Sequence, residues 1–292
     1  MNGGVMFSQR GATPDLSGSP APAAPFASLP SPASVPGQVR LISDAGPAPG
    51  IELISDGAIW RPRGGSQVLA RRIANPVTIQ STLLTLAETI GPFPGGLVRS
   101  GMRLRLEAWI GHSGISSANR FAFWKSVNPV SVEISQLNMA LSGTDLNTLL
   151  AGTLDILADA GAGHRSIRGI SSTYPNAGTS QRNINIDFSQ QWETGLYLQS
   201  VNETPVNITG ASWSAGVVTF TANAHTLAVG DKTTIAGITP SGYNGVYIVT
   251  SVPNANTFTA TLASDPGAYV SGGTSSRISN VVSEGYTLTL LG

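Results

Sequence analysis

Apolar and polar residues alternate with a period of two along most of the chain between residues 68 and 200. In MRLRLEAWIGH (102–112), leucine, alanine and isoleucine occupy one face and charged residues occupy the other. NINIDF (183–188), VSVEI (130–134) and YTLTLLG (286–292) follow the same rule. Because successive side chains of a β-strand point to opposite faces, this pattern predicts an all-β protein with half-buried strands.

One segment departs from that period. In TDLNTLLAGTLDILADAG (144–161), Leu146, Leu149, Leu150 and Leu157 have the spacing of one helix face. Gly and Thr in the middle of this segment weaken the helical reading. A short helix and a strand pair therefore both remain open for residues 144–158.

Two repeats of LISD, at residues 41–44 and 53–56, flank a Gly- and Pro-rich turn. The second repeat runs into Asp56-Gly57, a strong two-residue hairpin signal. We predict a three-stranded meander within residues 38–66, with strands near 38–43, 51–55 and 58–61. Such a small sheet cannot bury a core alone, so it must pack on the next domain or on other copies of the chain.

Residues 1–37 are rich in Pro, Ala and Ser, a composition that favours extended chain and needs a partner surface to become ordered. We interpret this region as an anchor peptide that adds nothing to the fold of the remaining chain. Its apolar contact residues are predicted to be Phe7, Phe26 and Leu29.

The pattern changes between residues 204 and 277. Short β-branched runs alternate with Gly-Asp, Asn-Gly and Pro-Asn turns at intervals of about eight to ten residues. This predicts a small β-barrel or sandwich module inserted into a loop of a larger domain. That larger domain is predicted to comprise residues 67–203 and 278–292, with a jelly-roll-like sandwich fold.

The amino-acid composition argues against several classes of function. Charged residues make up only 11% of the chain and the formal net charge is zero, so no basic field favours nucleic acid or an anionic membrane. Cysteine is absent, which excludes disulfides and thiolate metal sites. No apolar stretch approaches the roughly eighteen residues of a membrane span. No nucleic acid partner and no membrane insertion are expected.

Candidate chemistry is sparse. The three histidines do not show the spacing of a metal site, and no phosphate-binding loop is apparent. We predict no catalytic residues, cofactor or metal. If the protein cleaved glycans, it would need a carboxylate pair, and the candidates are Glu107, Glu133, Asp187 and Glu193.

Four residues are candidates for contact with a host surface: Trp109, on the polar face of its strand, with His112, Tyr243 and Asn244.

Two quoted segments carry a family resemblance. SLPSPASVPGQVRLISDAG (28–46) with ELISDGAIWRPRGG (52–65) resembles the linker and meander of bacteriophage head-fibre and tail-fibre proteins. HTLAVGDKTTIAGITPSGYNGVYIVTSVPNANTFTATL (225–262) is similar to small β modules found in phage virion proteins. The strands ending in GYTLTLLG (285–292) resemble the trimeric jelly-roll head of such fibres.

The resemblance implies a non-enzymatic virion structural protein, made in the host cytoplasm and located on the particle surface. It implies a homotrimer attached to capsid or tail proteins through residues 1–37, with its distal end contacting a bacterial surface glycan or protein. The alternatives are a polysaccharide-degrading tail spike enzyme and a capsid decoration protein without a receptor role.

Overall fold

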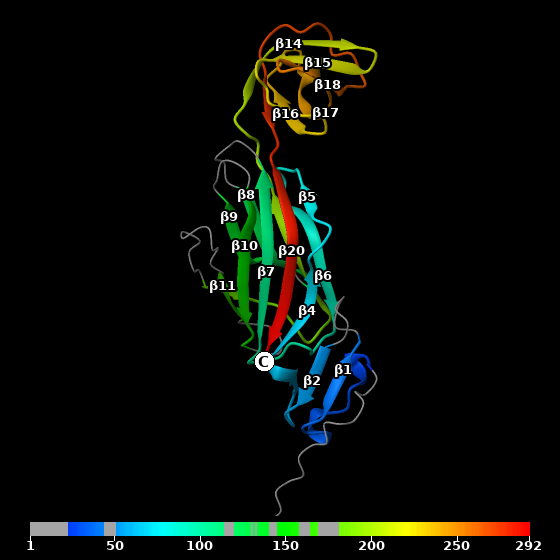
Figure 1. Cartoon of the computed structure of the whole chain (residues 1–292), viewed down its shortest axis with the longest axis vertical. Helices are drawn as coiled ribbons and strands as arrows, with labels where there is room; N and C mark the ends of the chain where they lie inside the picture. Colours follow the sequence, from blue (N-terminus) through cyan, green and yellow to red (C-terminus); the bar gives the residue numbers. More distant parts are fainter. Residues whose placement is uncertain are drawn as a thin grey trace, which may run out of the picture.

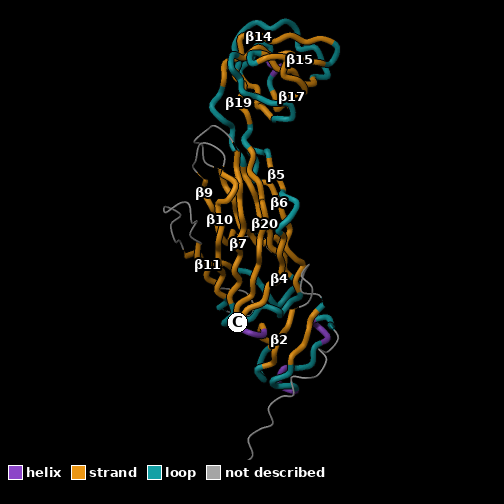
Figure 2. Tube along the Cα trace, viewed as in Figure 1, coloured by secondary structure: helices purple, strands orange, loops and turns teal. Residues whose placement is uncertain are grey.

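The computed structural model describes most of the chain and has an elongated shape with a small meander at one end, a two-sheet sandwich in the middle and a barrel at the other end (Figure 1). The described residues are 23–43, 51–113, 120–129, 131, 133–139, 145–157, 164–168 and 181–292. Strands dominate these residues, and the helical segments among them are short 3-10 turns (Figure 2). The predicted all-β class is confirmed.

The meander is a three-stranded antiparallel sheet in the order β1-β2-β3. Its strands are β1 (Val39–Ile42), β2 (Ile51–Ser55) and β3 (Trp60–Pro62). The turn between β2 and β3 spans residues 56–59, two residues longer than the predicted two-residue hairpin, and Gly57 within it has a φ of +90°. Ile42, Ile51, Leu53 and Trp60 are buried and belong to the core of the sandwich.

Three 3-10 turns flank the meander. Turns η1 (Phe26–Ser28) and η2 (Pro32–Ser34) precede β1, and η3 (Arg63–Gly65) follows β3. Together with the meander they form the narrow lower end of the molecule in Figure 1.

The larger sheet of the sandwich has the order β12-β11-β10-β7-β20-β4, and β5 also pairs with β20. Its strands are β4 (Ser66–Arg72), β5 (Val77–Ile79), β7 (Arg103–Ser113), β10 (Asp145–Asp155), β11 (His164–Arg168), β12 (Gln181–Ile184) and β20 (Asn280–Leu291). Residues 145–155, for which helix and strand were both open, form strand β10 between β7 and β11.

The smaller sheet has the order β6-β13-β8-β9. Its strands are β6 (Thr85–Phe93), β8 (Arg120–Asn128), β9 (Glu133–Met139) and β13 (Trp192–Gln199).

Strand order identifies the sandwich as a jelly roll. Eight strands can be numbered one to eight in chain order: β4, β6, β7, β8, β9, β10, β13 and β20. In these numbers the strand order is one-eight-three-six across the larger sheet (β4-β20-β7-β10) and two-seven-four-five across the smaller sheet (β6-β13-β8-β9). This is the pairing of a jelly roll, in which the chain crosses between two sheets as it winds. Strands β5, β11 and β12 extend the larger sheet beyond that set.

The space between the two sheets is filled by aromatic and aliphatic side chains. The Trp192 ring lies 4.5 Å from Phe93 and 5.2 Å from Phe188, measured between ring centroids. Trp124 is fully buried and its indole N–H donates to the Thr194 hydroxyl at 2.5 Å. A buried Trp in a core satisfies its polar atom in this way, because an unpaired N–H would cost free energy.

Between β13 and β20 the chain forms a closed six-stranded barrel in the order β14-β15-β18-β17-β16-β19. Its strands are β14 (Val206–Ser214), β15 (Val217–Ala222), β16 (Lys232–Ala236), β17 (Gly245–Asn254), β18 (Thr257–Thr261) and β19 (Thr274–Arg277), with the 3-10 turn η4 (Ser241–Tyr243). Its core surrounds Phe220, whose ring contacts those of Tyr243, Tyr247 and Phe258.

The barrel joins the jelly roll through two antiparallel chain segments, which we call the neck (residues 200–205 and 277–280). Asn202 pairs with Ile278, and the Glu203 N–H donates to the Arg277 carbonyl at 2.7 Å. The Ser200 hydroxyl hydrogen-bonds to Ser279. Figure 1 shows the barrel projecting from the jelly roll on these two segments, at the end opposite the meander.

Candidate functional site

Residues 23–37 pack against the chain's own meander. Ala24 forms a parallel bridge with Ile42, the Trp60 indole N–H donates to the Pro30 carbonyl at 3.2 Å, and the Ser55 hydroxyl donates to the Pro32 carbonyl at 2.7 Å. This segment therefore contributes to the fold, and the expectation that residues 1–37 add nothing to it is wrong for residues 23–37.

Two of the predicted anchor residues belong to this packed segment. Phe26 and Leu29 are partly buried and pack against the jelly-roll core. An apolar side chain gains as much by covering its own core as by covering a partner, so the composition of the segment did not distinguish the two. The third predicted anchor residue, Phe7, lies outside the described residues.

A pocket of about 290 Å³ lies between this segment, the meander and the loop after β6. It is lined by Phe26, Ala27, Leu29, Pro30, Ser31, Pro32, Ala58, Ile59, Trp60, Gly95, Gly96 and Arg99. Gly96 has a φ of +79°, and a Cβ there would lie 3.1 Å from the Arg99 guanidinium and 3.6 Å from the Phe26 ring.

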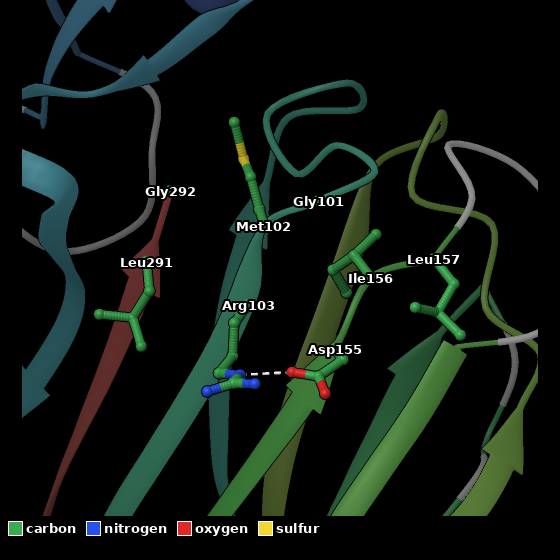
Figure 3. A pocket seen from close by; sticks show the side chains of 8 residues that line it. All are labelled: Gly101, Met102, Arg103, Asp155, Ile156, Leu157, Leu291 and Gly292. Atoms are coloured by element: carbon green, nitrogen blue, oxygen red, sulfur yellow. Dashed lines mark hydrogen bonds and ion pairs between the residues drawn. The ribbon is translucent and has the colours of Figure 1, made fainter.

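A second pocket, of about 370 Å³, opens at the same end of the molecule, where β7 begins and β10 and β20 end (Figure 3). Its lining consists of Gly101, Met102, Arg103, Asp155, Ile156, Leu157, Leu291 and Gly292. Arg103 and Asp155 form an ion pair, and the hydrogen bond from Arg103 to Asp155 raises the pKa of the arginine. Leu157, which also lines this pocket, is 53% exposed.

The hairpin between β2 and β3 is held by one carboxylate. Asp56 accepts hydrogen bonds from the backbone N–H groups of Ala58 and Ile59, both at 2.8 Å, and pairs with Arg61 at 2.5 Å. Donors that favour the ionised form lower the pKa of the group. The pKa of Asp56 falls to about 2, mainly through the bond from Ile59 and then through Arg61.

Of the four predicted host-contact residues, Trp109 lies on the outer face of the larger sheet. It is 36% exposed, and its strand neighbours in register are Leu149 on β10 and Gly285 on β20. Its role in contact stays a prediction.

Of the other three, His112 and Tyr243 are buried, whereas Asn244 is exposed and its role in contact stays a prediction. His112 is fully buried, because it shares the inward parity of Leu104 and Ile110 on β7. Tyr243 is 1% exposed in the barrel core, and its hydroxyl donates to the Gly267 carbonyl at 2.7 Å. The Asn244 amide is occupied by the chain itself, since it accepts from the Ile238 N–H at 2.9 Å and donates to the Ile238 carbonyl at 3.1 Å.

The four candidate carboxylates are distributed over both sheets and one turn. Glu107 faces outward from the larger sheet, where it pairs with Arg105 at 2.5 Å. Glu193 faces outward from the smaller sheet, on the opposite side of the sandwich. Asp187 accepts from the Ser189 N–H and hydroxyl, which lower its pKa. Glu133 lies opposite Lys125 on the neighbouring strand β8.

The barrel carries an apolar surface that the sequence patterns did not single out. Val246 and Ile248 on β17 are 63% and 55% exposed, and Val229, in the turn that hydrogen-bonds to β17, is 65% exposed. Both β17 positions alternate with the buried Tyr247 and Val249. The period-two pattern of this strand could therefore have indicated that Val246 and Ile248 face outward.

Within the part of the chain that the structure describes, no group of three or more His, Asp or Glu residues could hold a metal ion. The same residues contain no helix that is long and apolar enough to span a membrane.

Comparisons with known proteins add little. No protein-family model matches the chain, and no curated protein matches it. Among solved structures, the chain is similar to the CBM2 module of the evolved Dit protein of Lactobacillus casei BL23 phage J-1, at 6% sequence identity and a TM-score of 0.19. The match covers 73% of this chain and 74% of the other. A TM-score this low supports no argument about fold or function.

Proposed function

We propose that this protein is a non-enzymatic structural component of a bacteriophage particle. In this proposal it is a trimeric fibre or spike, attached to the capsid or tail at its N-terminal end and contacting the host surface with its barrel. The class of protein comes from the resemblance of residues 28–65 and 225–262 to phage fibre and virion modules.

One observation carries the proposal: the barrel and the N-terminal segment lie at opposite ends of an elongated molecule (Figure 1). A protein that bridges a particle and a cell needs its two contact regions separated in this way. A closed barrel also leaves no free sheet edge, so it is a stable module to present at a distal position.

At the particle end, the described surface supports attachment in two ways. Two pockets open there, one beside Trp60 and one beside Leu157, and both have apolar lining residues. Residues 1–22, which contain Pro14, Pro20 and Pro22, directly precede the segment that packs beside the first of these pockets. Extended Pro-rich chain loses little conformational entropy when it binds.

The arrangement of acidic residues favours a binding role over glycan hydrolysis. A glycosidase needs two carboxyl groups about 5 to 10 Å apart across the scissile bond. Glu107 and Glu193 instead point away from each other on the two outer faces of the sandwich. Asp187 is held by Ser189 in a turn.

The experiment removes the barrel at the neck. Because Asn202 and Ile278 are paired across antiparallel segments, replacing residues 203–277 by Asn-Gly should close the jelly roll with a two-residue hairpin turn. We expect particles carrying this variant to assemble but to adsorb to cells more slowly. A Val246→Lys/Ile248→Lys variant of the complete chain tests whether the apolar barrel surface makes the contact.

Unchanged adsorption by the barrel deletion would remove the receptor role from the proposal. Absence of the protein from purified particles would contradict the virion role itself. Shortening of capsular or lipopolysaccharide glycans by the purified protein would favour the tail spike enzyme instead.

A further inference from the structure

The exposed apolar side chains of the jelly roll are concentrated in one stretch of sequence. Among the described residues of the jelly roll, seven large apolar side chains are exposed, and five of these belong to residues 68–86. Four of the five lie where the chain passes from the larger sheet to the smaller one: Ile73 is 68% exposed, Leu83 76%, Leu84 39% and Leu86 39%. We call these four residues the edge surface.

The edge surface lies on one narrow side of the sandwich. Strands β4 and β5 end the larger sheet and β6 ends the smaller sheet, and all three follow the same side in Figure 1. Arg72 on β4 binds Glu88 on β6, which brings the turn after Arg72 close to the strand that carries Leu86. Leu86 pairs with Tyr197 on β13, and its side chain covers Gly195 of the same strand, where a Cβ would lie 2.7 Å from the Leu86 Cδ1.

This side carries few of the charges that protect sheet edges, because Arg71 is the exposed charge on β4 and the segment that follows β4 is almost uncharged. Natural edge strands are blunted by Lys and other charged residues that oppose pairing with another chain. From residue 73 to residue 93 the only charged residue is Glu88, and its side chain is 8% exposed and neutralised by Arg72. Another copy could therefore approach the segment from residue 73 to residue 93 without meeting an unpaired charge on it.

We propose that the edge surface is the contact between copies of this chain. The inference names a contact surface for the trimer proposed above and rests on that proposal. A nine-residue strand such as β6 is about 30 Å long, and a two-sheet edge with its side chains is roughly 20 Å thick. The side therefore offers on the order of 600 Å² per copy before its flanking turns are added, close to the roughly 800 Å² per partner of a stable interface.

A second copy is the occupant that this surface fits best. The four side chains of the edge surface are apolar, and the exposed charge beside them on β4 is Arg71, so the surface matches an apolar surface better than a charged one. In a closed ring, the edge of one copy meets a different surface of the next, and the ring closes after a fixed number of copies.

The test compares two variants of the full chain, each with two exposed apolar residues replaced by lysine. Leu83→Lys/Leu86→Lys changes the edge surface, and Val246→Lys/Ile248→Lys changes an equally exposed pair on the barrel. Light scattering coupled to gel filtration gives the mass at micromolar concentration, and circular dichroism with thermal melting checks that both variants fold.

We expect wild-type protein and the barrel variant to have a mass of several chains, and the edge variant to have the mass of one 30.1 kDa chain while keeping its β-sheet spectrum. A folded edge variant that keeps the wild-type mass would overturn the inference and leave the trimer standing. A single-chain mass for wild-type protein would overturn both the inference and the trimer, while incorporation into particles and adsorption would still test the virion role separately. A two-chain wild-type mass that the edge variant loses would support the edge contact and correct the number of copies.

Discussion

The guanidinium group of Arg72 on β4 forms an ion pair with two hydrogen bonds to the carboxylate of Glu88 on β6, and this pair connects the edges of the two sheets of the jelly roll. Arg72 also donates to the Ser283 hydroxyl at 2.8 Å and to the carbonyls of Ala74 and Asn75 at 2.8 and 2.7 Å. Its guanidinium lies 5.9 Å from the centroid of the Tyr286 ring. A single cation thus connects β4, β6 and β20.

Removing one member of this pair should be more damaging than removing both. Glu88→Gln leaves a largely buried guanidinium without its counter-charge, and a broken buried pair costs about 3 to 5 kcal/mol. The double variant Arg72→Met/Glu88→Leu leaves no unpaired charge and should lose less. Urea unfolding of the two variants and of wild-type protein measures the difference. Equal losses in both variants would show that the pair acts through packing alone.

Two deletions of different length should distinguish the role of residues 1–22 from that of residues 23–37. Deletion of residues 1–22 removes none of the described contacts to the meander, whereas deletion of residues 1–37 also removes the acceptors of Trp60 and Ser55. We expect the longer deletion to lower the melting temperature, because it uncovers buried Trp60 and leaves polar groups unpaired. We expect the shorter deletion to leave the melting temperature unchanged and to reduce incorporation into particles. Normal decoration of particles by the shorter variant would argue against attachment through residues 1–22.

The meander should weaken in acid. The folded pKa of Asp56 is about 2 against an ordinary value of 3.8, so its stabilising contribution is complete above about pH 3.8 and is lost as the pH falls through about 2. Asp56→Asn removes the titrating group and should be less stable than wild-type protein at neutral pH, with a smaller further loss in that acid range. Carboxyl chemical shifts measured by NMR give the Asp56 pKa directly, and a midpoint near 3.8 would refute the assignment.

Glu203 in the neck should be a site where losing a charge stabilises the protein. Its side chain is 3% exposed, and neither carboxylate oxygen has a hydrogen-bond partner. Arg277, on the segment opposite, pairs with Asp231 at 3.2 Å. Burying an uncompensated charge is costly, so Glu203→Gln should raise stability by about 1 to 3 kcal/mol. Thermal melting compares it with Glu193→Gln, a control on the outer face of the smaller sheet, and a lower melting temperature for Glu203→Gln would contradict the argument.

The period-two pattern could predict the strands because a strand alternates its faces wherever it lies. The alternation in 102–112 and 286–292 corresponds to β7 and β20, and the Asp56-Gly57 signal corresponds to the β2–β3 turn. The same parity placed Trp109 on an outer face and contained the information that His112 points inward. That second consequence was missed because a histidine near a strand end suggested a polar loop.

Short-range patterns in the sequence were enough to predict short strands separated by turns, because alternation and turn residues act over a few neighbouring positions. Only the tertiary structure decided which strands pair, since β4 and β20 are neighbours in the sheet although more than 200 residues separate them, and alternation is compatible with any partner. It also decided that Phe26 and Leu29 cover the chain's own core and that Tyr243 is buried in the barrel. Burial depends on what lies across the core, and residues far away in the sequence supply that surface.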